Sequence, residues 1–163
     1  MALTPAQLAV LKADILADQA LASKPMTSAG AMEIVTAYKL AASPAWVVWK
    51  SSLSRKEAQA DGFDWTQCDN LTTGQARIWE WIFDSSGVMN PSEPGVRSGI
   101  SECWKGTAAK VAVATFVLGK CKRDANRAEK LFSSGLGTTL SPATMGFEGS
   151  LSSDDVQQAR ELP

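Results

Sequence analysis

The sequence offers few side chains that could perform catalysis, because it contains no histidine. Histidine is the commonest general base and the commonest transition-metal ligand, so zinc hydrolases and Ser-His-Asp or Cys-His schemes are excluded. Carboxylate pairs remain, notably Asp61 with Asp64 and Asp154 with Asp155. Both pairs lie at expected helix ends, where an acidic residue already caps the helix and faces its dipole. We therefore predict no catalytic residue, cofactor or metal ion, and interpret the chain as not an enzyme.

The cysteines and glycines give no further sign of chemistry. Cys68, Cys103 and Cys121 are widely spaced and odd in number, which argues against a disulfide framework and against a Cys-x-x-Cys pair. We interpret them as free, partly buried thiols. The pattern Gly135-x-Gly137 lacks the strand, third glycine and following helix of a phosphate-binding loop, so it indicates a turn.

Charge is unevenly distributed along the chain. The net charge is −1, but residues 105–130 hold seven basic and two acidic side chains, a local +5 that leaves −6 elsewhere. Such a bipolar chain suits contacts with copies of itself or with an oppositely charged partner. The basic residues that could touch a nucleic-acid backbone or a protein partner are Lys120, Lys122, Arg123, Arg127 and Lys130. Since the whole chain is slightly acidic, we favour a helix end that faces solvent or protein.

Aromatic side chains gather in residues 71–83 of a chain that has six tryptophans. Trp79, Trp81 and Phe83 are spaced so that they spread over more than one face of a helix. A single core cannot receive all of them from one side. This helix is therefore either sandwiched in the centre of the protein or offers an aromatic face to a partner. We expect these residues mainly to build the core, with at least one available to a neighbouring copy.

Capping signals and apolar periodicity predict a mainly α-helical protein. Helices are expected to begin at capping residues: Thr4, Ser28, Ser54, Thr72 or Thr73, Thr107 and Ser152. A further helix follows the loop at 88–95, and the longest runs from Thr107 to about Phe132. Residues 45–50 are ambiguous, because their valines and tryptophans favour a strand while Ser43-Pro44 resembles a helix start. We expect a helix there.

The character of the chain changes after Ser133. Residues 133–155 are rich in Gly, Ser and Thr and show no helical or clear strand period, so they indicate an extended segment anchored by Met145 and Phe147. We predict one domain, a helical bundle over residues 1–132, with an extended arm and a short C-terminal helix over residues 133–163. The apolar runs are too short to cross a bilayer and the N-terminus does not resemble a secretory signal. We expect no membrane partner.

Five strings carry a resemblance to a known family: TPAQLAVLKADILAD (4–18), ASPAWVVWK (42–50), DWTQCDNLTTGQARIWEWIFD (64–84), NPSEPGVRSGISECWKG (90–106) and RAEKLFSSGLGTTLSPATMGFEGSLSSDDVQQAR (127–160). In these strings the chain resembles a family of small proteins encoded by tailed bacteriophages and prophages of proteobacteria, mostly without a defined role among the virion structural genes. The last string is the most specific, because GTT-x-SPATM-x-FEG-x-LS has no common structural reason to arise by chance.

The resemblance implies a non-enzymatic structural protein of the phage virion, assembled in the host bacterial cytoplasm. By analogy of size and character, a helical body with an arm looks like the ring-forming adaptor, or connector, proteins that join portal to tail at the neck. Expected partners are copies of the chain itself and portal or tail proteins, with DNA contact incidental. Alternative roles are a tail, fibre-attachment or capsid-decorating protein, or a DNA-contacting packaging-associated protein. The candidate interface residues are Trp79, Trp81, Met145, Phe147, Lys120, Lys122, Arg123, Arg127 and Lys130.

Overall fold

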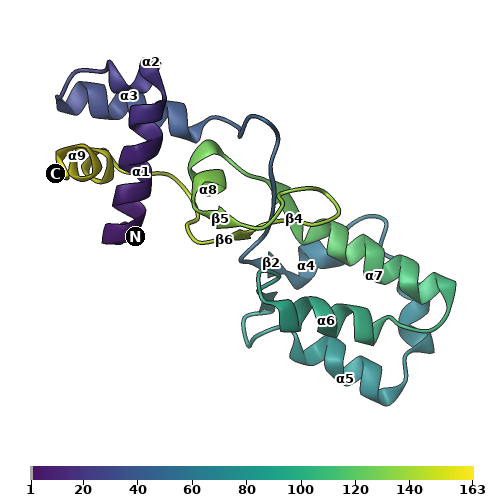
Figure 1. Cartoon of the computed structure of the whole chain (residues 1–163). Helices are drawn as coiled ribbons and strands as arrows, with labels where there is room; N and C mark the ends of the chain where they lie inside the picture. Colours follow the sequence, from purple (N-terminus) through teal and green to yellow (C-terminus); the bar gives the residue numbers. More distant parts are fainter. Residues whose placement is uncertain (1) are drawn as a thin grey trace. The chain divides into compact units, whose positions relative to one another are not determined.

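Figure 1 shows the computed structural model of the chain, which describes residues 2–163. Helices make up 52% of the structure and the strands are short, so the protein is mainly α-helical, in agreement with the prediction. The chain groups into two compact units. Unit 1 comprises the described residues up to Val47 together with Asp124–Pro163, and unit 2 comprises Val48–Arg123. The predicted single bundle is therefore not confirmed, and residues 133–163 lie within unit 1.

Unit 1 is built from both ends of the chain. Its elements are α1 (Pro5–Ala17), α2 (Gln19–Ala22), α3 (Ser28–Lys39), α8 (Arg127–Leu131), β5 (Ser133–Ser134), β6 (Thr144–Met145) and α9 (Ser153–Glu161). The predicted capping boxes form at Thr4 with Gln7 and at Ser152 with Asp155. Helix α3 is capped by Thr27, one residue before the expected cap.

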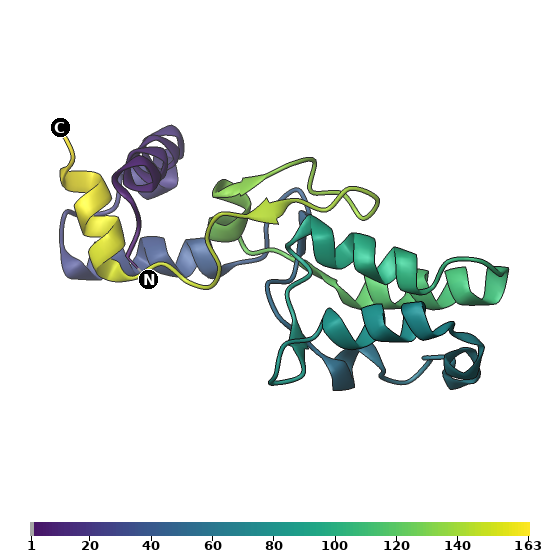
Figure 2. The ribbon, with the colours of Figure 1, turned by 90° about the horizontal axis from the view of Figure 1, so that it is seen from below.

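The core of unit 1 lies between helices α1, α3 and α9, which pack together in both views (Figures 1 and 2). Each helix contributes apolar side chains at helical spacing, because such spacing places them on one face. The buried residues from these helices include Leu8, Leu11, Ile15, Ile34, Val35, Tyr38, Val156 and Ala159. The short strands β5 and β6 pair antiparallel, with Ser133 opposite Met145.

Unit 2 is a continuous segment with its own core. Its elements are β2 (Leu53–Ser54), α4 (Arg55–Ala58), the 3-10 helix η1 (Trp65–Asn70), α5 (Thr73–Trp81), β3 (Val88–Met89), α6 (Pro94–Cys103) and α7 (Ala108–Lys120). Strands β2 and β3 pair antiparallel, with Leu53 opposite Met89. The largest completely buried side chains of this core include Trp104, Ile100 and Val117.

Two sequence predictions are wrong where the chain passes between the units. Residues Val47–Trp49 form strand β1, not a helix, and β1 pairs with β4 (Lys122–Asp124). Two successive β-branched residues beside tryptophans favour the strand, as their propensity indicated. The helix expected from Thr107 to Phe132 ends at Lys120. A new helix, α8, begins after Asn126, which forms a capping box with Glu129 that the sequence reading missed.

Candidate functional site

Helix α5 of unit 2 carries two tryptophans in opposite environments. Trp79 is only 4% exposed, whereas Trp81 is 76% exposed. Two residues correspond to more than half a helical turn, so the two indole rings leave the helix on opposite sides. Of the two outcomes predicted for this segment, the structure has the one in which an aromatic face is left uncovered within this chain.

Trp79 belongs to an aromatic cluster in the core of unit 2. Its ring centroid lies 5.1 Å from that of Phe83, 5.4 Å from Trp104 and 6.2 Å from Phe63. The pairs with Phe83 and Trp104 are edge-to-face, the geometry that the quadrupoles of aromatic rings prefer. Trp79 therefore mainly stabilises the fold and exposes only 4% of its surface.

Trp81 borders a surface pocket of about 710 Å³ in unit 2. We call it the Trp65–Trp81 pocket. Its lining residues are Arg55, Gln59, Trp65, Cys68, Leu71, Thr73, Ala76, Arg77, Trp79, Glu80 and Trp81. Trp65 is 58% exposed, so two large aromatic side chains stand open at this pocket. Sequence reading missed Trp65, because nothing in its spacing distinguishes it from a core aromatic residue.

The charged groups at the edge of the pocket are partly neutralised by each other. Arg55 donates two hydrogen bonds to the Glu80 carboxylate, at 2.7 and 2.9 Å, and its guanidinium lies 4.4 Å from the centre of the Phe83 ring. The hydrogen bond from Arg55 lowers the pKa of Glu80, so the pair stays ionised at neutral pH. Inside this edge the pocket is lined mainly by apolar surface, which suits an apolar segment of a partner.

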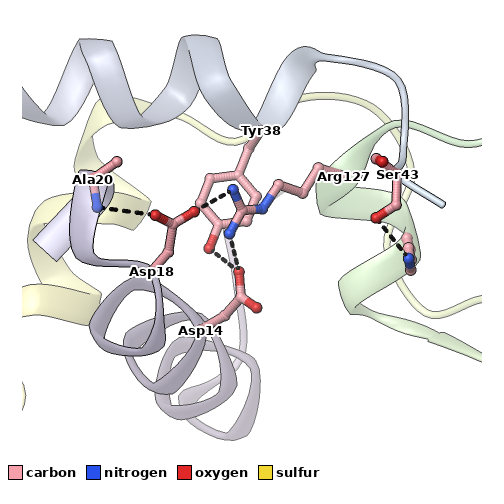
Figure 3. Close-up of polar contacts among 7 residues, drawn as sticks. Asp14, Asp18, Ala20, Tyr38, Ser43 and Arg127 are labelled. Atoms are coloured by element: carbon pink, nitrogen blue, oxygen red, sulfur yellow. Dashed lines mark hydrogen bonds and ion pairs between the residues drawn. The ribbon is translucent and has the colours of Figure 1, made fainter.

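A second feature is a cleft of about 770 Å³ in unit 1, where the predicted interface residues Arg127 and Lys130 lie. Figure 3 shows Arg127 reaching two carboxylates. It donates to Asp18 at 2.9 Å and to Asp14 at 3.0 Å. Tyr38 donates its hydroxyl hydrogen to the same Asp14 oxygen at 2.5 Å, and its ring centre lies 4.7 Å from the guanidinium. Arg127 thus links α8 to Asp14 of α1, to Asp18 at the start of α2 and to Tyr38 of α3.

The surroundings of Asp18 and Arg127 favour the charged forms of both side chains. The hydrogen bond from Arg127 is the largest influence on Asp18 and lowers the pKa of that carboxyl. Desolvation opposes the charge of Arg127, but the hydrogen bonds to Asp18 and Asp14 outweigh it and raise the pKa of the guanidinium. Burial, followed by the bond to Asp14, raises the pKa of Tyr38, so the phenol stays protonated. The contacts of Arg127, Asp14, Asp18 and Tyr38 therefore hold α8 against α1 and α3.

Lys130 is also engaged within unit 1. Its ammonium donates to the carbonyl oxygens of Ser43 at 3.1 Å and Pro44 at 3.4 Å, and lies 5.3 Å from the centre of the Trp46 ring. The Trp46 indole N–H in turn donates to the Ser133 hydroxyl at 2.8 Å. These contacts tie residues 43–46 to α8 and the start of β5. The polar lining of the cleft is therefore largely used to hold unit 1 together.

The other predicted basic residues belong to unit 2. The ammonium of Lys120 lies 5.1 Å from the Phe116 ring centre, and that of Lys122 lies 5.3 Å from the Trp49 ring centre. Arg123, the last residue of unit 2, is half-buried. The five basic residues grouped by sequence are therefore divided between the units, three in unit 2 and two in the unit 1 cleft.

The two apolar anchors predicted in the arm have different surroundings. Phe147 is buried in the core of unit 1, where its ring centre lies 5.5 Å from that of Phe132. Met145 is half-buried in β6. Exposed apolar side chains occur instead in the loop between β5 and β6, where Leu136 and Leu140 are 68% and 97% exposed. The sequence offered Met145 and Phe147 as the anchors of this segment and did not single out Leu136 or Leu140.

Comparisons of this chain with protein-family models, with curated proteins and with solved structures give no match. Within residues 2–163, no cluster of three or more His, Cys, Asp or Glu side chains is placed to hold a metal ion. No helix in the same range has both the length and the apolar character needed to cross a membrane.

Proposed function

We propose that this chain is a non-enzymatic structural protein of a tailed-phage virion that works by assembly. The observation that carries the proposal is the open aromatic pair Trp65 and Trp81 at an otherwise largely apolar pocket. Tryptophan is enriched among the residues that anchor protein interfaces, and leaving two of them in water is unfavourable unless a partner covers them. The resemblance of the sequence strings supports the virion as the setting.

Within the virion, we propose the position of a head-to-tail adaptor at the neck, bound to the portal and to copies of itself. In a ring, each subunit meets the next through two different surfaces, so a pocket on one surface needs a matching group elsewhere on the chain. The bipolar charge of the sequence supports such head-to-tail contacts. Tail, fibre-attachment and capsid-decorating positions would use the same surfaces.

The segment that follows Ser133 remains, in this proposal, a contact arm. Its contact part is the loop with Leu136 and Leu140, since Phe147 packs inside its own unit. The helical body of the proposed adaptor then consists of two units, with the arm as a projection from unit 1.

Protein contact is favoured over DNA contact by the partners of the basic residues. Arg127 binds two carboxylates and Lys130 binds two backbone carbonyls, so both of these candidate cations are already engaged within the chain. A DNA-binding surface needs cations that are free to reach phosphates.

The test is electron microscopy of purified particles of the phage or prophage that encodes the chain, with the chain located in the density. We expect a ring beneath the portal. Density on the tail, fibres or shell would retain the structural class and overturn the neck position. Absence of the chain from particles, checked by mass spectrometry of the same preparation, would overturn the structural role.

A further inference from the structure

The loop between β5 and β6 presents two leucines to solvent in an ordered setting. Leu140 is 97% exposed and Leu136 is 68% exposed. In both ribbon views this loop, in yellow-green, leads away from helices α1, α3 and α9 of its own unit (Figures 1 and 2). Among the large apolar side chains of residues 2–163, Leu140 has the highest exposed fraction, so a partner that covers it would remove nearly all of its apolar surface from water.

Hydrogen bonds at both ends of the loop hold it in one shape. Val47 donates its N–H to the Gly137 carbonyl at 2.8 Å, and its own carbonyl accepts from Ala143 at 2.9 Å. A turn closes between Thr138 and Ser141, with bonds of 2.9 and 3.1 Å. The loop is therefore preorganised, which reduces the entropy lost when it binds a partner.

Gly137 shows how closely the loop is seated. Its φ is +63°, and a Cβ atom at this position would lie 2.1 Å from the Trp46 ring. Only glycine allows this approach. The base of the loop is thus packed against Trp46, while the side chains of Leu136 and Leu140 remain outside.

The Trp65–Trp81 pocket of unit 2 has the size and character to receive these leucines. Its volume is about 710 Å³. The pocket beside the exposed Leu16 and Met26 measures about 100 Å³, much less than the Trp65–Trp81 pocket.

Charge also matches between the loop and the pocket. Residues 135–147 contain no charged side chain, and the Arg55–Glu80 pair at the pocket is neutral as a whole. Arg77, which also lines the pocket, has a stem long enough to keep its guanidinium in water when an apolar segment binds. Neither partner would therefore bury an uncompensated charge.

We propose that the loop of one copy inserts Leu136 and Leu140 into the Trp65–Trp81 pocket of a second copy. The contact is heterologous, because each copy offers one loop and one pocket, and it can repeat from copy to copy. This inference rests on the proposed function as an assembly protein and identifies the partner surface.

The apolar area that this contact could bury is small, so the contact depends on many copies. At about 200 Å² for each indole side chain, the open parts of Trp65 and Trp81 amount to roughly 300 Å². A stable pairwise interface buries about 800 Å² on each partner. We therefore expect weak pairing in solution and strong assembly where copies are held side by side.

A disulfide trap detects this contact even when it is weak. Cys68 lines the pocket and is partly exposed, while Cys103 and Cys121 are buried. Burial raises the pKa of each of the latter two to about 12, so they stay unreactive thiols. In the full-length variant Leu140→Cys, mild oxidation should join residue 140 of one copy to Cys68 of the next. We expect a reducible ladder of dimers, trimers and larger species on a denaturing gel.

Matched variants decide how the ladder arises. Adding Cys68→Ser should abolish it, and adding Trp81→Ser should reduce its yield severalfold. The variant Leu16→Cys, which places a thiol at another exposed leucine of unit 1, should give no more crosslinking than the wild-type chain. A mixture of wild type with Leu140→Cys/Cys68→Ser should give a dimer and nothing larger, since each copy then carries one of the two cysteines.

The contrary outcomes are equally distinct. No disulfide between residues 140 and 68 would overturn the contact, as would a ladder from Leu16→Cys equal to that from Leu140→Cys. A 140–68 disulfide formed only within single chains would overturn the copy-to-copy assignment. The crosslinking result is independent of particle imaging. The crosslink can form whatever position the chain has in the virion, and it can fail to form even if imaging places the chain at the neck.

Discussion

Trp79 and Trp81 illustrate how residues of one type, two positions apart, serve different purposes. Trp79 packs against Phe63, Phe83 and Trp104 in the core of unit 2. Trp81 leaves the opposite side of α5 and is largely in water. The helical spacing alone predicted that the aromatic residues would divide between faces. It could not say which face the rest of unit 2 covers.

Substitution of these two tryptophans should therefore have unequal effects on stability. We expect Trp79→Ala to lower the free energy of unfolding by about 3–5 kcal/mol, because it leaves a cavity in the aromatic cluster. Trp81→Ala should change it by no more than about 0.5 kcal/mol, as for other exposed positions. Urea denaturation followed by circular dichroism measures both. Equal losses for the two variants would show that Trp81 is also part of the core.

At the scale of elements, Arg127 links helices that are far apart in the sequence. It lies at the first position of α8 and binds Asp14 of α1 and Asp18, the residue that caps α2. The sequence reading placed Arg127 in one long basic helix. Helix α7 instead ends at Lys120, and the separate helix α8 begins after Asn126. Arg127 therefore lies in unit 1, where its charge binds Asp14 and Asp18.

This linkage predicts a dependence of stability on pH. Arg127 lowers the pKa of Asp18 below its ordinary 3.8, so the stabilisation is complete above the unfolded-state pKa and is lost as the pH falls through the lower folded-state pKa. We expect Asp18→Asn to be less stable than the wild type at about pH 7, and we expect this difference in stability to be smaller at about pH 2.5. Urea unfolding at both values measures the difference.

The variant Asp61→Asn is the matched control, since Asp61 is an exposed acidic residue of unit 2. Its free energy of unfolding, relative to that of the wild type, should be nearly the same at both pH values. If Asp18→Asn lost the same amount of unfolding free energy at both pH values, the charge of Asp18 would not be the source of the stabilisation by Arg127.

At the scale of the whole molecule, the two units differ in how the chain builds them. Unit 2 is continuous from Val48 to Arg123, and the buried residues of its core all fall inside that range. Its first and last residues lie in β1 and β4, which pair with each other. Unit 1 needs both ends of the chain. A core closed within one segment is the condition for independent folding.

We therefore predict that the fragment 48–123 folds alone, whereas the fragments 2–47 and 124–163 do not fold separately. The expected result for fragment 48–123 is a cooperative urea transition with coincident changes in circular dichroism and tryptophan fluorescence. A gradual, non-cooperative change would show that the core of unit 2 depends on unit 1.

Local signals in the sequence were sufficient for much of the secondary structure. The capping boxes at Thr4, Ser54, Thr72 and Ser152 all form, because a cap and its partner are only three residues apart and need no tertiary contact. The absence of histidine alone excluded several catalytic classes. The mainly helical class followed from the same short-range patterns.

Tertiary structure decided the points at which distant segments meet. The sequence could not show that β1 would pair with β4, or that residues 133–163 would join the N-terminal helices in unit 1. It also could not separate Trp79 from Trp81, or reveal the pocket around Trp65 and the loop of Leu140. Burial depends on which other elements cover a face, and that is determined by contacts between residues far apart in the chain.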